Sequence, residues 1–529
     1  MQIMDYGCMA IFLFVIIYIG CIFAKRGQTT SAFLLGSGKM PWWAVGVSYL
    51  MALLSTVSLV ATPGEAYNHG LRFYIFDWIG PISGLITFYL FIRFYFKVKT
   101  FTPFAYLESR YSPAVRAVIS TAYLFMRVSY LAMVLFSCAL VFKGLADWNV
   151  PLTITLIGIV ALLYSSLGGL KAVIWVNVIK FFALCGSLIT TLVVCLGQVD
   201  GGPLGVLNYA FAHDHGFNFS SVNSDFFSFD PHVRITLWLL IISSLGGYMF
   251  SNSADQIAIQ QLLSTSSYKK ARNSFVTSIS IALPFSFLLW FLGLSMFAYF
   301  GQHPLPEGNP AGDVAMFKFI KLKMPSPLPG LVASAMLATA ISTSGAAMNA
   351  LATVATKDFY FRFFRPNARE EDQVKFSRAS TVVVGILAIC LSISISIVSR
   401  SLGETVMEAA SMWIAVMCVI APTFLVGVIS RRANTAHILT AIFCGWAATA
   451  CMIIWYYVSK RNGHPISFMA IQVPGLLLTI FIGMITPYIF GTPVSESKIK
   501  GLTLWTFNSK SEAQEKSENS EKSKEITQV

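Results

Sequence analysis

Charged residues are scarce in this chain, and so are the motifs that mark many enzymes and pumps. Only 12% of the 529 residues are charged, against roughly 25% in ordinary soluble domains. No GxxxxGK[ST] phosphate-binding loop occurs, which argues against an ATP-driven pump. The nine cysteines form no CxxC pair and fall in or beside apolar stretches, so we interpret them as small hydrophobic residues. The seven histidines are scattered, and we expect no enzyme activity and no cofactor.

Long apolar runs dominate the sequence instead. Hydrophobic residues make up 56% of the chain, and the mean hydropathy is +0.68. Runs long enough to cross about 30 Å of hydrocarbon recur from Asp5 to Phe490 with short polar links between them. Lipid offers no hydrogen bonds to the backbone, so such runs must be helices. The sequence therefore predicts an all-α polytopic membrane protein embedded in a lipid bilayer.

About thirteen transmembrane helices are predicted from windows of roughly 19 residues. Their approximate ranges are 5–23, 42–64, 73–96, 114–142, 151–169, 172–196, 234–262, 274–300, 328–354, 378–399, 405–429, 434–457 and 467–491.

Basic residues are concentrated in alternate loops between these spans. By the positive-inside rule these loops are cytoplasmic, which places the N-terminus outside and the C-terminus inside a plasma or inner membrane. The net charge of +13 is then explained by attraction to an anionic leaflet, with no nucleic acid partner. After Tyr488 the sequence becomes polar, and we expect a disordered cytoplasmic tail at 492–529.

Hydroxyl groups lie in the middle of the 331–354 segment, LVASAMLATAISTSGAAMNALATV. In a helix, Thr339, Ser342 and Thr343 share one face, because their positions are i, i+3 and i+4. Oxygen ligands without a carboxylate suit a weakly held monovalent cation better than calcium. The alternative is that Ala338, Ser342 and Ala346 form a seam of small residues for close packing of membrane helices.

Ionisable residues inside the spans are the next signal, because a charge at membrane depth is costly. Five stand out: Asp77, Arg127, Lys180, Asp255 and Glu408. Arg127 lies roughly 20 Å into its helix, and its fork of donors suits a carboxylate, either that of a solute or that of Asp77. Asp77 can also be an ordinary interfacial residue near the start of its span.

Two spans contain features of interrupted helices. The 42–64 span has several serines and ends at Pro63-Gly64, and the 234–262 span has Gly246-Gly247 followed by SNSADQIAIQQ. Each opens a stretch of five spans, and an odd number of spans makes the second stretch inverted relative to the first. Inverted repeats with broken helices are typical of secondary transporters.

Five motifs together resemble the sodium/solute symporter family. They are WWAVGVSYLMALLSTVSLVATPGEAY, SSLGGLKAVIWVNVIK, SADQIAIQQLLS, the 331–354 segment with TKDFY after it, and APTFLVGVISRRAN. The resemblance implies a leucine-transporter-like fold and sodium-driven uptake by alternating access. It also implies six segments: an extra N-terminal helix and loop (1–41), a first five-helix repeat (42–196), an extracellular loop (197–233), a second inverted repeat (234–429), two C-terminal helices (430–491) and the tail (492–529).

The resemblance also assigns site residues. The implied sodium ligands are the carbonyls of Met51, Leu54 and Thr339 and the hydroxyls of Ser342 and Thr343. The implied substrate-binding residues are Ser55, Thr56, Ser58, Phe73, Asp77, Arg127 and Asp255, with Phe76 as a gate. Arg127 falls where sialic acid transporters of the family place an arginine against the substrate carboxylate.

Departures from the family pattern bear on coupling. The usual W-T-D-V-I-Q is Trp-Val-Asn-Val-Ile-Lys here, so Asn177 and Lys180 replace an acid and an amide. An additional sodium site of some members needs hydroxyls where this chain has Gly345 and Ala346, so we expect a single sodium site. Lys180 either extends to the cytoplasmic vestibule or responds to the bound ion or to a proton.

We therefore predict a sodium-coupled symporter, functional as a monomer, that imports a small polar solute with a carboxylate, similar to sialic acid or a monocarboxylate. The alternatives are a sodium/sugar symporter and a sodium-independent or proton-linked facilitator.

Overall fold

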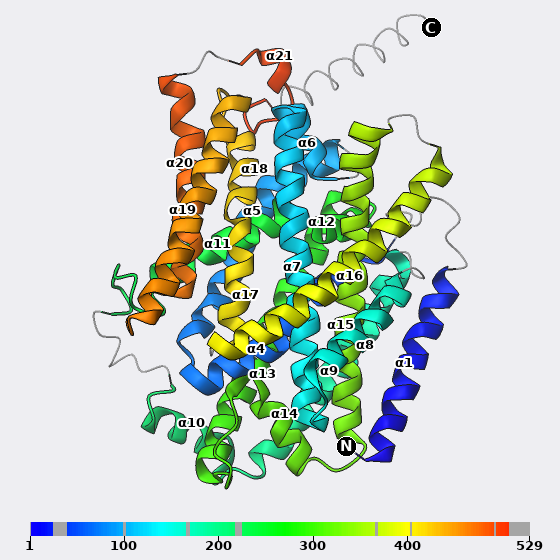
Figure 1. Ribbon diagram of the computed structural model, residues 1–529, viewed down its shortest axis with the longest axis vertical. Coiled ribbons are helices and arrows are strands. Elements are labelled where there is room, and N and C mark those ends of the chain that lie inside the picture. The colour runs from blue at the N-terminus through cyan, green and yellow to red at the C-terminus, as the bar shows by residue number, and fades with distance from the viewer. Residues whose placement is uncertain are drawn as a thin grey trace, which may run out of the picture.

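The computed structural model describes residues 2–24, 40–98, 102–165, 170–216, 225–365, 369–402, 405–490 and 494–506. Within these ranges the ordered elements are helices, and no β-strand occurs (Figure 1). Most of the predicted polar tail, 507–529, lies outside the described residues, as do the loop at 25–39 and the 166–169 part of the SSLGGL motif.

Long helices occupy the apolar runs of the sequence. They are α1 (Ile3–Ala24), α5 (Ile75–Val98), α7 (Pro113–Ala146), α8 (Val150–Ser165), α9 (Leu170–Leu196), α13 (Tyr268–Gln302), α15 (Leu328–Val354), α16 (Glu370–Leu402), α19 (Thr435–Arg461) and α20 (Val473–Ile489). In the described part of the chain, 8 helices are long and apolar enough to cross a membrane, or up to 10 if each bent pair is one span. The all-helical membrane fold is confirmed, while the count of thirteen spans is not.

Both helices that the sequence predicts to be interrupted are broken. α3 (Trp42–Leu53) and α4 (Thr56–His69) meet at 67°, and α11 (Leu237–Ser253) is separated from α12 (Gln256–Leu263) by Ala254 and Asp255. The first break lies at Leu54–Ser55, and α4 continues through Pro63-Gly64, where the predicted span ends. The second lies beyond Gly246-Gly247, which are inside α11.

A third break was not expected from the sequence. The predicted continuous span 405–429 is divided into α17 (Val406–Ile414), the 3₁₀ segment η4 (Ala415–Val419) and α18 (Ile420–Ile429). Its two ends are bent by 54°. Pro422 has no N–H to donate and lies in the first turn of α18, which fits a helix that restarts there.

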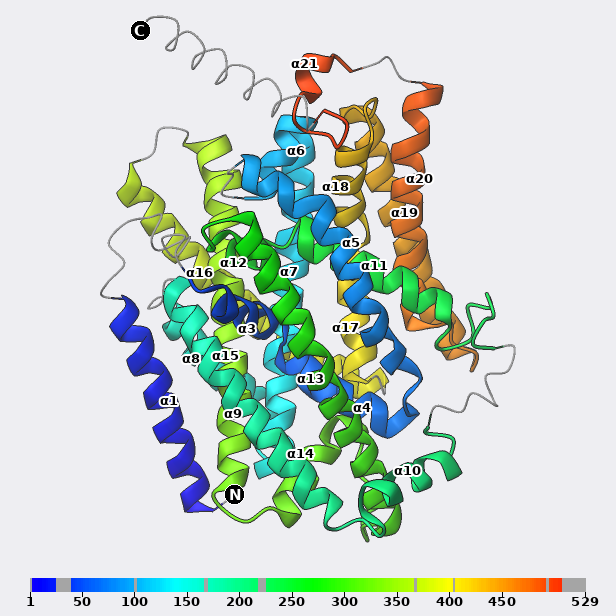
Figure 2. The same cartoon turned by 180° about the vertical axis from the view of Figure 1, so that it is seen from behind.

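The helix α15 lies in the core of the bundle. Nearly all of its side chains are buried, and it packs on α7, α8, α9 and α16. Its alanines, serines and glycine allow neighbouring backbones to approach closely, as in membrane helix interfaces generally. α1 packs along α15 at one edge, and α19 with α20 forms the opposite edge (Figures 1 and 2).

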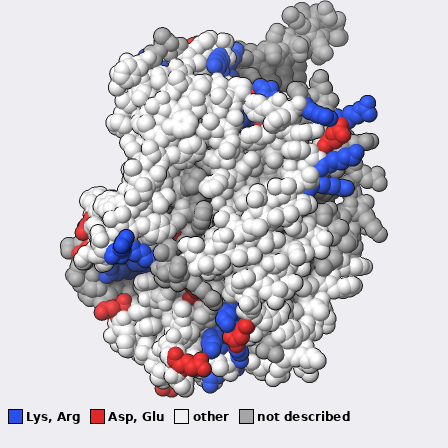
Figure 3. Space-filling view, viewed as in Figure 1, with Lys and Arg blue, Asp and Glu red and all other residues white. Residues whose placement is uncertain are grey.

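The outer surface is suited to lipid. Large apolar side chains are exposed on the outer helices, among them Phe287, Ile397, Ile454 and Phe481. On the face drawn in Figure 3, charged side chains gather toward the ends and edges, with a broad uncharged surface between them. In a membrane this surface would face the hydrocarbon.

Short elements cover the two ends of the bundle. α10 (Gly202–Ala212) and α14 (Gly312–Lys323) lie at one end, which we call the α14 end. α6 (Phe104–Arg110), α21 (Glu496–Ile499) and the π-helical η3 (Ala355–Phe364) lie toward the other, the α6 end. The 3₁₀ segments η2 (Arg72–Tyr74) and η5 (Phe468–Gln472) precede α5 and α20.

Candidate functional site

The break between α3 and α4 frees backbone carbonyls in the interior. The last bond of the α3 ladder runs from the Leu54 N–H to the Leu50 carbonyl. Ser55 is extended, at φ −115° and ψ 172°. The carbonyls of the last turn of α3 therefore have no helical N–H from which to accept a hydrogen bond. The predicted ligands Met51 and Leu54 are in this turn.

Lys180 on α9 reaches the predicted sodium site. Its Nζ lies 2.7 Å from the Ser342 Oγ of α15 and 3.4 Å from the Met51 carbonyl oxygen of α3. Ser342 in turn donates to the Thr339 carbonyl at 3.3 Å. The Lys180 side chain is fully buried, so the alternative in which it extends to the vestibule is wrong.

The remaining predicted sodium ligands are buried beside these contacts. The Thr343 hydroxyl has no hydrogen-bond partner in the described part of the chain, whereas the Thr339 hydroxyl donates to the Ala335 carbonyl at 2.7 Å. Thr339 and Thr343 are 0% and 4% exposed. The structure thus brings Met51 and Ser342 together around an ammonium group, and Ser342 links this group to the Thr339 carbonyl.

Asn177 makes a second link between α9 and α3. Its Nδ2 donates to the Ser48 Oγ at 3.0 Å and lies 3.4 Å from the Ser48 carbonyl. Asn177 and Lys180 are three residues apart, as are Ser48 and Met51, so matching positions on two helices form a ladder. Asn177 lies where the family pattern has an acid, and its side-chain amide holds α9 against α3.

Arg127 on α7 is paired with Asp255 at the α11–α12 break, not with Asp77. The rings of Tyr123 and Tyr130 lie 5.8 and 5.4 Å from the guanidinium carbon. Arg127 and Asp255 are both buried, and the Arg127 Nε makes no hydrogen bond to a described residue. Asp255 also caps α12 by accepting from the Ile257 N–H at 3.0 Å.

The expectation that Arg127 could pair with Asp77 is wrong, because Asp77 is bound to α13. Its Oδ2 accepts from the Ser286 hydroxyl and from the Trp290 Nε1 at 2.7 Å. Aromatic residues surround this point: the Phe73 ring stacks on Phe76 with centroids 5.3 Å apart and on Trp290 at 6.1 Å. Phe73, Phe76 and Asp77 therefore form one group with α13.

The three predicted hydroxyl residues at the start of α4, Ser55, Thr56 and Ser58, differ in their surroundings. Thr56 donates to the Val134 carbonyl of α7 at 2.8 Å, so it joins α4 to α7. Ser55 is fully buried at the break, and Ser58 is half-buried. Thr56 is thus engaged in helix packing.

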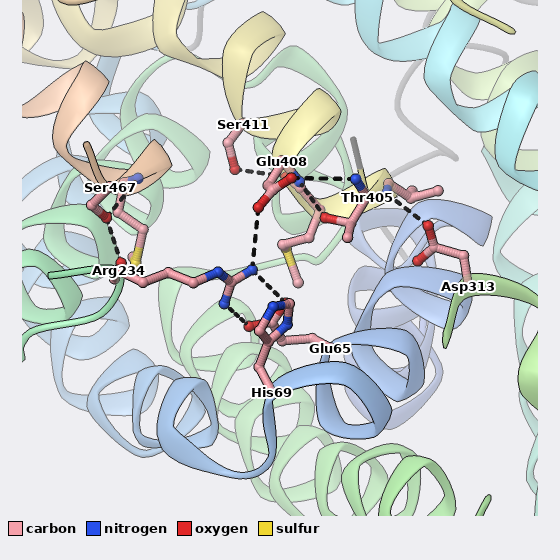
Figure 4. Close-up of polar contacts among 11 residues, drawn as sticks. Glu65, His69, Arg234, Asp313, Thr405, Glu408, Ser411 and Ser467 are labelled. Atoms are coloured by element: carbon pink, nitrogen blue, oxygen red, sulfur yellow. Dashed lines mark hydrogen bonds and ion pairs between the residues drawn. The ribbon is translucent and has the colours of Figure 1, made fainter. Parts of the chain in front are cut away.

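A cluster of charged residues at the α14 end was missed by the sequence prediction, apart from Glu408. Arg234 pairs with Glu65 of α4 and lies 3.6 Å from a carboxylate oxygen of Glu408 on α17 (Figure 4). His69 lies 3.3 Å from Glu65. Arg234 also covers the Phe468 ring at 5.0 Å, and Phe468 stacks on Phe73. We call these charged residues, Glu65, His69, Arg234, Glu408 and the nearby Asp313, the end cluster. Through Phe468 it contacts the aromatic group formed by Phe73, Phe76 and Trp290. Its members come together only in the folded protein, so no local motif predicts it.

Ionisation in the end cluster is tuned by burial and neighbours. Burial alone would lower the pKa of Arg234, but Glu65 and Glu408 raise it above its usual value. Burial raises the pKa of Asp313 on α14 to about 6, and the charges of Glu65 and Glu408 add to this effect. The Asp313 carboxylate still accepts from the Val406 N–H at 2.9 Å, which opposes the rise.

A cavity of about 630 Å³ adjoins the end cluster, with Arg234, Glu408, His232 and His464 among its lining residues. Among the described residues, no group of three or more His, Cys, Asp and Glu side chains could hold a metal ion. The predicted sodium site differs from such groups because its oxygens come from carbonyls and hydroxyls.

Comparison with known proteins identifies the family. The model of the sodium:solute symporter family matches residues 33–445. The chain belongs to this family. It is a secondary active symporter.

Relatives of known activity cover almost the whole chain. It is 25% identical over 503 residues to the sodium/sialic acid symporter NanT of Aliivibrio fischeri, covering 94% of this chain and 96% of NanT. It is 24% identical to the sodium/sialic acid symporter SiaT of Proteus mirabilis, covering 93% and 97%. The sodium-dependent multivitamin transporter of Oryctolagus cuniculus is 28% identical, over 84% of this chain and 69% of that protein.

Solved structures show the fold. The substrate-bound outward-open form of a Na⁺-coupled sialic acid symporter matches with a TM-score of 0.81 at 22% identity, covering 93% of this symporter and 100% of that chain. Mhp1, a nucleobase-cation-symport-1 family transporter, matches with a TM-score of 0.53 at 11% identity, over 89% and 98%. The predicted leucine-transporter-like fold is thereby confirmed.

Proposed function

We propose that this symporter uses sodium to import a small carboxylate-bearing solute, similar to sialic acid or a monocarboxylate. One observation carries the proposal: a buried guanidinium, that of Arg127, lies at the break between α11 and α12, and its Nε donor has no hydrogen-bond partner among the described residues. A buried donor without a partner costs free energy, and a fixed fork of donors suits a carboxylate. The sialic acid relatives NanT and SiaT support the same solute class.

The proposed roles of the site residues follow from the geometry and the family resemblance. Sodium is bound by the carbonyls of Met51, Leu54 and Thr339 and by the hydroxyls of Ser342 and Thr343. The solute contacts Ser55, Thr56, Ser58, Phe73, Asp77, Arg127 and Asp255. Phe76 acts as a gate, and Asn177 and Lys180 couple the ion site to α3. Asp77 and Thr56 also form hydrogen bonds to neighbouring helices, which supports a fixed position for both residues in the site.

Alternating access requires that the two ends of the bundle open in turn. We place the α14 end outside and the α6 end in the cytoplasm, as the basic loops indicate. The end cluster and the aromatic group then form an outer closure that joins α4 to α17. The two repeats at 42–196 and 234–429 would each contribute one broken helix to the site between them.

Uptake into proteoliposomes tests the proposal. Radiolabelled N-acetylneuraminate, lactate and glucose are each supplied with an inward sodium gradient or with choline in its place. We expect sodium-stimulated uptake of a carboxylate, reduced about tenfold or more by Arg127→Lys, which keeps the charge but loses the planar fork. Arg93→Lys is the matched control, because Arg93 is exposed on α5 and lies over the Tyr268 ring.

Two results would contradict the proposal. Sodium-stimulated uptake of glucose alone would favour the sugar symporter. Equal uptake with sodium and with choline would favour a sodium-independent facilitator.

A further inference from the structure

Asp77 carries a carboxylate that no basic residue in the described part of the chain neutralises. Its Oδ2 accepts hydrogen bonds from the Ser286 hydroxyl and the Trp290 Nε1 of α13, and both donors are neutral. Its Oδ1 makes no hydrogen bond to a described residue, and Asp77 is half-buried, so this oxygen is not closed off. Asp77 therefore keeps an acceptor for a group that these residues do not supply.

Two buried carboxylates of the bundle are neutralised by the chain itself. Glu65 pairs with Arg234, and Asp255 pairs with Arg127. Such pairing is expected, because a carboxylate held away from water is costly without a cation or several donors. Asp77 lies in the first turn of α5, yet the hydrogen bonds of its side chain go to α13. Its charge is thus left for a partner from outside the chain.

Aromatic rings are the other groups near Asp77. The aromatic group of Phe73, Phe76 and Trp290 includes the tryptophan that donates to Asp77. The Tyr74 ring lies 5.7 Å from the Trp290 ring, between centroids. The face of an aromatic ring carries a negative potential, so rings beside a carboxylate favour a positive charge.

The chain already places one cation on this stack of rings. The guanidinium carbon of Arg234 lies 5.0 Å from the centroid of the Phe468 ring, and Phe468 stacks on Phe73 at 6.2 Å. Arg234 is also the partner of Glu65. A carboxylate and an aromatic ring together thus hold a cation at one end of the stack. Asp77 offers the same combination without a cation from the described residues.

The chemistry of these groups selects an organic ammonium. A carboxylate only accepts hydrogen bonds, so its partner must donate them or carry a positive charge. A small metal cation prefers several oxygen ligands, and aromatic hydrocarbon rings offer none. A protonated or methylated amine gains from the carboxylate and from the ring faces at once.

We propose that Asp77 and the aromatic group bind an ammonium group of the transported solute. The solute is then a zwitterion with a carboxylate and an amine, such as an amino acid or a betaine. This inference rests on the proposed function, in which Arg127 binds the solute carboxylate, and it narrows the solute class. The zwitterion has no net charge of its own, and its ammonium compensates Asp77 in the loaded site.

Three pairs of compounds with matched shapes test the inference. In each pair a carbon group replaces the ammonium: L-alanine and isobutyrate, γ-aminobutyrate and valerate, glycine betaine and tert-butylacetate. Dissociation constants are measured in sodium for the purified full chain in detergent, from the rise of the melting temperature with ligand concentration. In at least one pair the ammonium compound should bind about tenfold or more tightly than its carbon analogue. This comparison uses wild type alone, so it does not depend on how a variant folds.

Asp77→Asn separates the charge of the side chain from its shape. The variant keeps an oxygen that can accept from the Ser286 hydroxyl and the Trp290 Nε1, but it carries no charge. The preferred ammonium compound should lose about tenfold in affinity and bind like its carbon analogue. Asp147→Asn, at the exposed end of α7, is the control and should keep the wild-type preference.

The outcomes separate this inference from the proposed function. If no pair shows a preference for the ammonium compound, or if Asp77→Asn keeps that preference, the inference is wrong. The proposed function is judged from all the carboxylates, with N-acetylneuraminate and lactate included. It stands if any of them binds in sodium and Arg127→Lys weakens that binding, whether or not an ammonium group is preferred. It fails if none of them binds.

Discussion

Arg127 of α7 forms a buried ion pair with Asp255 at the break between α11 and α12. This pair connects a continuous helix to an interrupted one. The same guanidinium is the proposed anchor for a solute carboxylate, so Asp255 competes with the solute for it. The solute would have to replace or share an internal carboxylate, which lowers its affinity but fixes where its charge can lie.

Removing the charge of Asp255 should therefore strengthen carboxylate binding. In Asp255→Asn the amide oxygen can still accept from the Ile257 N–H, so the cap of α12 is kept. The variant should have a lower melting temperature without solute, because a buried cation without its partner costs about 3–5 kcal/mol. N-acetylneuraminate or lactate, whichever is transported, should then raise the melting temperature more than in wild type. Asp147→Asn at the exposed end of α7 is the control, and an equal shift in both proteins would contradict the prediction.

The two adjacent hydroxyls of α15 should differ in their effect on stability. Ser342→Ala removes the nearer oxygen from the buried Lys180 ammonium and should destabilise the sodium-free protein by about 1–3 kcal/mol. Thr343→Val keeps the shape and removes a hydroxyl that bonds to no residue in the described part of the chain, so the sodium-free protein should change little. Both variants should weaken ²²Na⁺ binding. Melting temperatures without sodium and binding with it test the two statements separately, and an unchanged sodium affinity in both would exclude these hydroxyls as ligands.

The site could be predicted in part because its residues lie in recognisable local patterns. The spacing of Thr339, Ser342 and Thr343 placed hydroxyls on a buried helix, and glycine and serine clusters marked two interrupted helices. The position of each break was not predictable. Pro63 lies inside α4 and does not end it. The helix is instead broken at Leu54–Ser55, where no local sequence signal marks the change in backbone angles.

Partners far apart in the sequence were the main part that could not be predicted. Lys180 and Ser342 are separated by 162 residues. The position of Lys180 along its own helix therefore could not predict that the two side chains are in contact. Arg127 had two candidate carboxylates, that of a solute and that of Asp77. The packing of α13 on α5 shows that Asp77 bonds to α13 instead. Arg234 precedes α11 in a connecting segment, where a single arginine gives no signal.

Breaking the end cluster should destabilise the folded protein. In Arg234→Met the Glu65 carboxylate, with 1% of its side chain exposed, keeps His69 as its one ionic partner within the described ranges. We expect a loss of about 3–5 kcal/mol, and Arg234→Met with Glu65→Gln should recover most of it because no buried charge is left unpaired. Melting temperatures of the single and double variants measure the recovery. If the double variant is as unstable as the single one, lost packing on Phe468, and not the unpaired charge, accounts for the effect.

Asp313 should give the end cluster a dependence on pH. Its pKa is raised to about 6, mainly by burial, and lies near 3.9 in an unfolded chain. The folded state therefore binds this proton more tightly, so Asp313 contributes stability as pH falls from about 7 through 6 toward 4, and its charged form is destabilising above pH 6. The shift corresponds to about 2–3 kcal/mol. Asp313→Asn keeps an oxygen for the Val406 N–H and removes the charge, so it should be more stable than wild type at pH 7.5 by up to this amount, with the difference falling to about 1 kcal/mol near pH 4.5. Melting temperatures of both proteins across this range provide the measurement, and a difference that does not change with pH would show that the carboxylate does not titrate there.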